Sequence, residues 1–68
     1  MELSARNQFK GHVTSIVRGG VLAEVTVDIG NGQQIVSVIT NGSVERLNLR
    51  EGSEVTAIIK ATEVLLAR

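Results

Sequence analysis

Two short clusters near opposite ends of the chain hold the residues best suited to bind a ligand. The first is Ser4–Gln8 (Ser-Ala-Arg-Asn-Gln) and the second is Lys60–Thr62 (Lys-Ala-Thr). Each places a cation beside small residues whose backbone amides are easy to approach. Neither contains a set of metal ligands or a nucleophile with a neighbouring base. A tetrahedral oxyanion requires N–H donors, hydroxyls and positive charge, so we expect the two clusters to bind an anion of this kind.

Several donors must converge on such an anion, because a dianion loses a large hydration energy when it enters a protein. A single lysine at about 4 Å contributes only about 4 kcal/mol at an effective dielectric constant of roughly 20. The rest of the lost hydration energy can be supplied by consecutive backbone amides at the start of a strand and by a hydroxyl at the end of a strand, together with the lysine charge. The candidate ligands are Ser4, Ala5, Arg6, Thr40, Lys60 and Ala61.

The composition argues against several other functions. The 68 residues contain no cysteine and one histidine, His12, which excludes disulfides, thiolate zinc sites and a centre built from histidines. The formal charge is zero and Phe9 is the single aromatic residue, whereas nucleic-acid-binding proteins usually have a basic excess and aromatic platforms. No spacing indicates an activated nucleophile, so we expect no enzymatic activity.

Targeting signals are also missing from the sequence. No apolar run approaches the roughly 20 residues that a membrane span needs. No charged segment followed by an apolar one opens the chain, so we expect a cytoplasmic protein without a membrane partner.

Apolar residues recur mostly with a period of two, which indicates strands with one buried face. Glycine-rich turns at 19–20 and 30–32 separate the first three strands. A spacing of three between Val44 and Leu47 predicts one or two turns of helix, with Asn41 or Ser43 as the cap. The predicted strands cover residues 9–16, 21–29, 33–39, 54–59 and 63–67. Five strands with a short helix between the third and fourth predict an all-β, five-stranded Greek-key barrel of the OB type.

The chain is long enough for one domain, residues 1–68, but its core is expected to be marginal. Small domains usually add disulfides, a structural metal or partner subunits, and only the last remains available here. The strands have apolar residues on both faces and would leave open edges. We therefore expect a homo-oligomer, with strand exchange or edge pairing at the N-terminal strand.

Five blocks of the sequence, in order and over nearly the whole chain, resemble the molbindins, which are small molybdate-binding proteins built from a single Mop domain. The blocks are Ser4–Gln8, Lys10-Gly11, Ala23–Val25, Ile39–Val44 and Ile59–Val64. Without this resemblance, Arg6 would be interpreted as a solvated residue at a frayed terminus and Lys60 as an exposed lysine at a strand end. The resemblance favours a ligand role for both.

The resemblance implies a homo-oligomer, a hexamer built as a trimer of dimers, that stores molybdate and tungstate and keeps their concentrations steady. It places the anion between subunits, bound by Ser4, Ala5, Arg6, Thr40, Lys60 and Ala61, with no organic cofactor. Some relatives have serine directly after the lysine, where this chain has Ala61, so one hydroxyl donor is lost here. A rigid cage of donors for a large tetrahedral anion would reject the smaller sulfate, and it could not accept a hydrogen bond from protonated phosphate.

Two alternatives remain open from the sequence alone. A small β-barrel of this kind could be a regulatory module that binds nucleic acid or a protein partner, although the zero charge and single aromatic residue argue against nucleic acid. It could also be a sensor that reports its occupancy to a larger machine.

Overall fold

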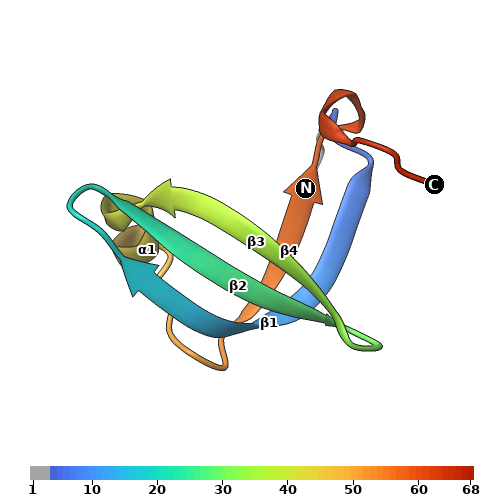
Figure 1. The fold of residues 1–68 in the computed structure, drawn as a ribbon. Coiled ribbons are helices and arrows are strands. Elements are labelled where there is room, and N and C mark those ends of the chain that lie inside the picture. The colour runs from blue at the N-terminus through green and yellow to red at the C-terminus, as the bar shows by residue number, and fades with distance from the viewer. Residues whose placement is uncertain (1–3) are drawn as a thin grey trace.

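The chain folds into one strongly curled antiparallel sheet with a short helix at one end. The computed structural model describes residues 4–68, and its strands lie in the order β3-β2-β1-β4 (Figure 1). The elements are β1 (Asn7–Arg18), β2 (Leu22–Gly30), β3 (Gln33–Thr40), α1 (Asn41–Arg46), β4 (Glu54–Ile59) and the 3₁₀ turn η1 (Ala61–Glu63). No helix within residues 4–68 is long and apolar enough to cross a membrane.

The first strand is shared by two hairpins and bends between them. Its first half, Asn7–His12, pairs with β4, and its second half, His12–Arg18, pairs with β2. The register shifts between Val13 and Ser15, which marks a β-bulge, a feature that bends a strand and increases its twist. Figure 1 shows β1 curving from one partner to the other. This bend turns a flat four-stranded sheet into an open barrel.

Gly11 lies just before the bend, where the backbone of β1 comes close to Asp28 near the end of β2. A Cβ atom at this position would clash with the Asp28 carbonyl oxygen and would lie 2.9 Å from Val27 Cγ1. Real Cβ atoms do not approach other atoms so closely. Glycine is therefore required here by the close approach of the two backbones.

The core is small and consists of short branched side chains. Val13, Ala23, Val25, Val27 and Val44 are buried, and they come from β1, β2 and α1. The partly buried residues packed against them are Ile16, Ile29, Ile39, Leu49 and Val55. The alternation of buried and exposed residues along β2 follows from the period of two in its sequence.

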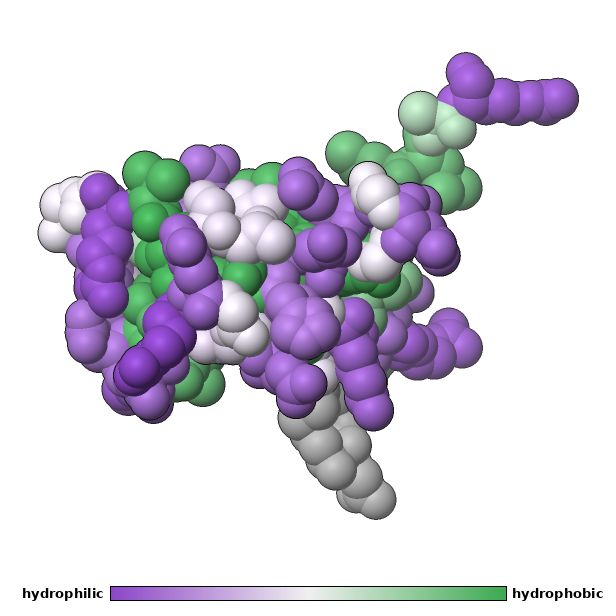
Figure 2. Space-filling model, turned by 90° about the horizontal axis from the view of Figure 1, so that it is seen from below, coloured by the Kyte–Doolittle hydropathy of each residue, from purple (hydrophilic) through white to green (hydrophobic). Residues whose placement is uncertain are grey.

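Much of the apolar surface stays exposed in the single chain. The exposed large apolar side chains are Phe9, Val17, Val21, Leu22, Val36, Val38, Leu47, Ile58, Val64, Leu65 and Leu66. Leu65 and Leu66 are 95% and 93% exposed and belong to the tail that follows η1. Figure 2 shows the apolar part of this tail projecting from the body of the molecule.

An apolar groove of about 450 Å³ lies between the two edge strands, β3 and β4. Its lining includes Ile35 and Ile39 from β3, Leu49, and Ala57 and Ile59 from β4. The barrel is therefore open along this side.

The helix α1 is capped by the last residue of β3. The Thr40 hydroxyl accepts a hydrogen bond from Ser43 N–H at 3.0 Å, as expected of an N-cap residue. Our prediction that Asn41 or Ser43 would be the N-cap residue is wrong, because the N-cap is Thr40. Asn41 instead joins the helix to the β1–β2 turn, because its backbone N–H donates to Val21 O and its side-chain Nδ2 donates to Gly19 O.

The sequence correctly predicted four of the strands and the helix, but the fifth strand is absent from the described chain. Residues 61–63 form the turn η1, and 64–68 make no strand. The turn has a physical cause: Glu63 N–H donates to Lys60 O at 2.8 Å, which reverses the chain at the end of β4. The tail then leaves the sheet, so its alternating residues have no neighbouring strand in the same chain (Figure 1).

The close approach at Gly11 predicts that Gly11→Ala lowers the free energy of unfolding by about 1–3 kcal/mol, because backbone atoms must shift to admit the methyl group. Denaturant unfolding at matched protein concentration measures this effect. Gly20→Ala is the control, since no atom lies within 4 Å of a Cβ placed there. Equal stability of the two variants would contradict the argument.

The cap predicts a difference between two substitutions of Thr40. Thr40→Val removes the acceptor for Ser43 N–H and should lower the free energy of unfolding by about 0.5–2 kcal/mol. Thr40→Ser keeps the hydroxyl and should have a smaller effect. The same unfolding experiment tests this, and equal losses for both variants would show that the hydroxyl does not cap the helix.

Candidate functional site

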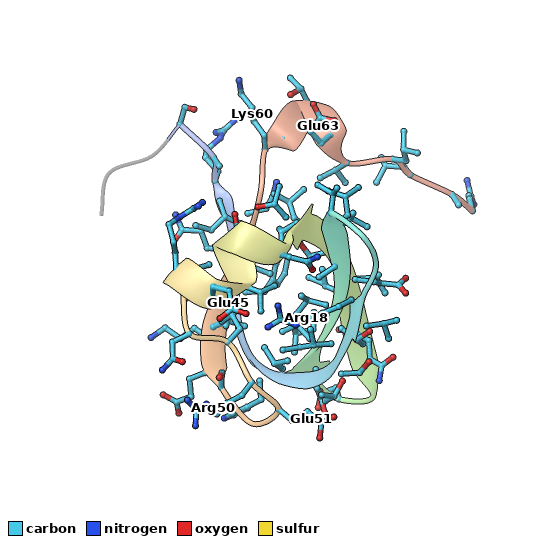
Figure 3. All side chains as sticks on the ribbon, turned by 90° about the vertical axis from the view of Figure 1, so that its left-hand side faces the viewer. Arg18, Glu45, Arg50, Glu51, Lys60 and Glu63 are labelled. Carbon is cyan, nitrogen blue, oxygen red and sulfur yellow. The ribbon has the colours of Figure 1, made fainter. Side chains whose placement is uncertain are left out.

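Five of the six candidate ligands lie together at one end of the molecule. The β1–β4 pairing places Asn7 opposite Ile59, so the segment before β1 and the segment after β4 lie side by side (Figures 1 and 3). We call Ser4, Ala5, Arg6, Lys60 and Ala61 the terminal cluster. Residues more than 50 positions apart in sequence therefore lie together, because β1 begins beside the end of β4.

Two side-chain amides hold the terminal cluster in shape. Asn7 Nδ2 donates to Ile59 O at 3.1 Å across the strand pair, and Gln8 Nε2 donates to Ala5 O at 3.4 Å. In the structure they act within the chain, and they fix the backbone on either side of Arg6 and Lys60.

The terminal cluster carries two positive charges with no paired carboxylate in the described chain. Within residues 4–68, Arg18 forms an ion pair with Glu45 at 2.8 Å, and His12 Nε2 lies 3.7 Å from Glu54 Oε1. Arg6 and Lys60 are exposed. Glu63 is also exposed on the same turn, and Figure 3 shows it near Lys60. The local balance is positive by one charge, which favours an anion.

The turn η1 also leaves backbone donors available. Its hydrogen bonds use Glu63 N–H and Val64 N–H, which donate to Lys60 O and Ala61 O. The N–H groups of Ala61 and Thr62 are therefore not used within the turn. Together with the Ser4 hydroxyl and the two cations, these amides give the terminal cluster the donors that an oxyanion needs.

Thr40, the sixth candidate, lies at the other end of β1. It pairs with Leu22 next to the β1–β2 turn, whereas the terminal cluster lies where β1 begins. Figure 1 shows α1 and η1 at opposite ends of the sheet. A single chain therefore does not bring Thr40 to the other five residues.

Two further polar residues lie beside Thr40, and the sequence alone did not identify them as part of a site. Ser43 Oγ lies 2.9 Å from Thr40 Oγ1, and Arg46 Nη2 donates to Ser43 Oγ at 3.0 Å. We call Thr40, Ser43 and Arg46 the hydroxyl cluster. The signal in the sequence was their spacing of three, which places all three on one face once a helix begins at Asn41.

A second cavity, with a polar lining, lies away from both clusters and does not suit an anion. It has a volume of about 720 Å³, and its lining includes Lys10, His12, Asp28, Glu54 and Thr56. The carboxylates of Asp28 and Glu54 oppose the charge of Lys10. Within residues 4–68, no group of three or more metal-binding side chains is assembled. The charges therefore favour the terminal cluster over this polar cavity as the anion site.

The chain is similar to known proteins over nearly its whole length. The sequence profile described as the TOBE domain matches residues 3–66. The chain is 47% identical to molybdenum-pterin-binding protein 1 of Clostridium pasteurianum over 66 residues, covering 97% of each protein. It is 50% identical to the probable molybdenum-pterin-binding protein of Haemophilus influenzae over 66 residues, covering 97% of this chain and 96% of the other.

Solved structures of similar proteins have the same fold as this chain. The fold matches MopII of Clostridium pasteurianum with a TM-score of 0.91 at 45% identity, covering 98% of this chain and 100% of that one. It matches a molybdate-binding protein of Sporomusa ovata with a TM-score of 0.93 at 40% identity over the full length of both. It also matches the cytoplasmic molybdate-binding protein ModG, in a form with molybdate bound, with a TM-score of 0.87 at 43% identity, covering 90% of this chain and 43% of ModG. The chain therefore belongs to the TOBE-domain family and, within it, to the molbindins.

Proposed function

We propose that this chain binds molybdate, with tungstate as a second possible ligand, and stores it without chemical change. The observation that carries the proposal is the terminal cluster, in which Arg6 and Lys60 lie together with exposed amides and a hydroxyl. Close relatives are named as molybdenum-pterin-binding proteins, and similar structures are of molybdate-binding proteins. In this proposal residues 1–68 form one binding domain with no catalytic role.

In the proposed site, positive charge and hydrogen bonds replace the water lost by the anion. Arg6 presents a planar fork suited to two oxygens, and Lys60 presents a compact charge. Ala61 contributes an amide but no hydroxyl. Molybdate offers only acceptors, so a cage of donors fits it, and a cage sized for molybdate grips the smaller sulfate weakly.

The position of Thr40 supports a site that is shared between copies. If one anion is bound by all six candidate ligands, the terminal cluster comes from one chain and Thr40 from a neighbour, because one chain holds them at opposite ends. This arrangement makes binding depend on assembly. A homo-oligomer is therefore part of the proposed function.

The tail and the groove support the same assembly. Val64, Leu65 and Leu66 are exposed in one chain, and the groove between β3 and β4 is lined by apolar side chains. Burying a leucine stabilises an interface by about 1.5–3 kcal/mol. We propose that the tail of one copy pairs along the open side of another, which would supply the fifth strand of the barrel, and that three such dimers form a hexamer.

The proposed function predicts that the chain binds molybdate far more tightly than sulfate in isothermal titration calorimetry. Lys60→Ala should weaken molybdate binding at least about tenfold, because a hydrogen bond from a charged donor is lost. Arg50→Ala removes an equal charge at the opposite end of the molecule and is the control (Figure 3).

Equal heats for molybdate and sulfate, or no heat for either, would refute the proposed function. An unchanged affinity in Lys60→Ala would instead refute the site assignment alone.

The proposed assembly predicts that Leu65→Ser/Leu66→Ser lowers the mass of the oligomer, because the tail no longer gains from burial. Sedimentation velocity and native mass spectrometry measure this change. Arg68→Ser alters the same tail without removing an apolar side chain, so it should leave the mass unchanged. A double variant with the parent's mass would exclude the tail from the interface.

A further inference from the structure

Asparagine followed by glycine occurs twice in the chain, at Asn31-Gly32 and at Asn41-Gly42. Asparagine is a chemically labile residue, and a following glycine makes it most reactive, because glycine has no side chain to shield its backbone nitrogen. The reaction is deamidation, which needs no enzyme. The two pairs lie in different surroundings, so the structure decides which of them reacts.

Asn31 and Gly32 form the two-residue loop of the β2–β3 hairpin. Gly30 pairs with Gln33 across the loop, and Asn31 and Gly32 have φ values of 55° and 73°. Two positive φ values in such a loop are typical of a type I′ turn, which closes with a hydrogen bond between the flanking residues and does not use the N–H of its second residue. Both loop residues are exposed, and Figure 1 shows the loop projecting from the end of the sheet.

The Asn31 amide and the Gly32 nitrogen are free to approach each other. Within residues 4–68, the Asn31 side chain takes part in no hydrogen bond. Apart from its chain neighbours, no atom of the described chain lies within 4 Å of a Cβ placed at Gly32. The side-chain amide can therefore rotate toward the Gly32 nitrogen, and water reaches both groups.

Asn41, in contrast, is held through its backbone and its side chain. Its N–H donates to Val21 O at 2.8 Å, and its Nδ2 donates to Gly19 O at 3.1 Å. It is also the first residue of α1, a helix that is packed on the core through the buried Val44. Both hydrogen bonds must break, and the start of the helix must move, before Asn41 Cγ can reach the Gly42 nitrogen. Such local opening costs free energy, so few molecules are reactive at any time.

We propose that Asn31 is a site of spontaneous deamidation in the folded protein, whereas Asn41 is protected. This inference is independent of the proposed function. The Gly32 nitrogen bonds to Asn31 Cγ and the bond from Cγ to Nδ2 breaks, so ammonia leaves with the proton of Gly32 N–H and a cyclic imide remains. Water then opens the imide at Cγ to give aspartate, or at the backbone carbonyl carbon of residue 31 to give isoaspartate. In either case one proton of the water returns to the Gly32 nitrogen, and its hydroxyl completes a carboxylic acid that ionises.

The two products differ in their effect on the hairpin. Each adds a negative charge to a chain whose formal charge is zero. Aspartate tolerates the left-handed backbone of residue 31, so the turn is kept. Isoaspartate places an additional methylene in the backbone, which a two-residue loop matched to the twist of its strands does not accommodate. The protein therefore accumulates two acidic forms with different geometry at this loop.

The test incubates the full-length protein in warm, mildly alkaline buffer, with and without denaturant, and digests samples with trypsin over time. No lysine or arginine lies between Arg18 and Arg46, so both Asn-Gly pairs fall in one tryptic peptide, residues 19–46, and are compared in the same molecule. Tandem mass spectrometry assigns the conversion to Asn31 or Asn41, and electron-transfer fragmentation distinguishes isoaspartate from aspartate. A sample digested before incubation corrects for deamidation during digestion.

Anion-exchange chromatography of the intact protein follows the acidic forms. Asn31→Gly is the matched control, because glycine tolerates the positive φ of the turn and has no amide to lose. It should form the acidic species far more slowly than the parent. Acidic species that appear as fast in Asn31→Gly as in the parent would overturn the proposal.

In the folded protein, Asn31 is expected to deamidate at least about tenfold faster than Asn41, because only Asn41 must first lose two hydrogen bonds. In denaturant the two pairs should react at similar rates. Equal rates in the folded protein, or a slower Asn31, would overturn the proposal. A preference for Asn31 that persists in denaturant would also overturn it, because its cause would then be the neighbouring sequence and not the fold.

Discussion

The transfer of β1 from β4 to β2 is the constraint on which the rest of the structure depends. Only His12 pairs with both neighbours, so the two hairpins overlap by a single residue and the strand must bend there. The bulge after Val13 supplies the bend, and Gly11 permits the backbones to approach. The same bend curls the sheet around its valines and carries the start of β1 to the end of β4. The terminal cluster is thus a consequence of the topology.

The size of the core explains why assembly and binding are linked in our proposal. Five buried residues, none larger than valine, leave more large apolar side chains outside than inside. A chain of this length buries too little surface for high stability alone. Covering the tail and the groove with a second copy would raise stability and would also bring Thr40 of one chain toward the terminal cluster of another. The same contacts would then serve both the fold and the site.

The sequence predicted what depends on local pattern and failed where geometry between elements decides. Period two identified β2, β3 and β4. The antiparallel pairing of β1 with β4, which brings Ser4–Arg6 to Lys60 within one chain, was not predicted, because it depends on contacts between elements. The prediction of a final strand at 63–67 was wrong for a single chain. Alternating apolar residues show that a segment can pair with a strand, but they do not show whether an edge strand of the same chain lies beside it. Ser43 and Arg46 were missed because the hydrogen bonds that join them to Thr40 exist only once α1 has formed.

The arrangement of charges explains how a chain with no net charge can present cationic sites. Several acidic groups are engaged locally: Glu45 pairs with Arg18, Glu54 lies near His12, and Asp28 accepts a hydrogen bond from Gly30 N–H in its own turn. Such exposed pairs contribute only about 0–1 kcal/mol to stability. The Arg18–Glu45 pair has a larger effect on the field, because a carboxylate paired with a cation opposes other nearby cations less. Arg6, Lys60 and Arg46 therefore act at the two clusters as local charges, and a dianion responds to these and not to the sum over the chain.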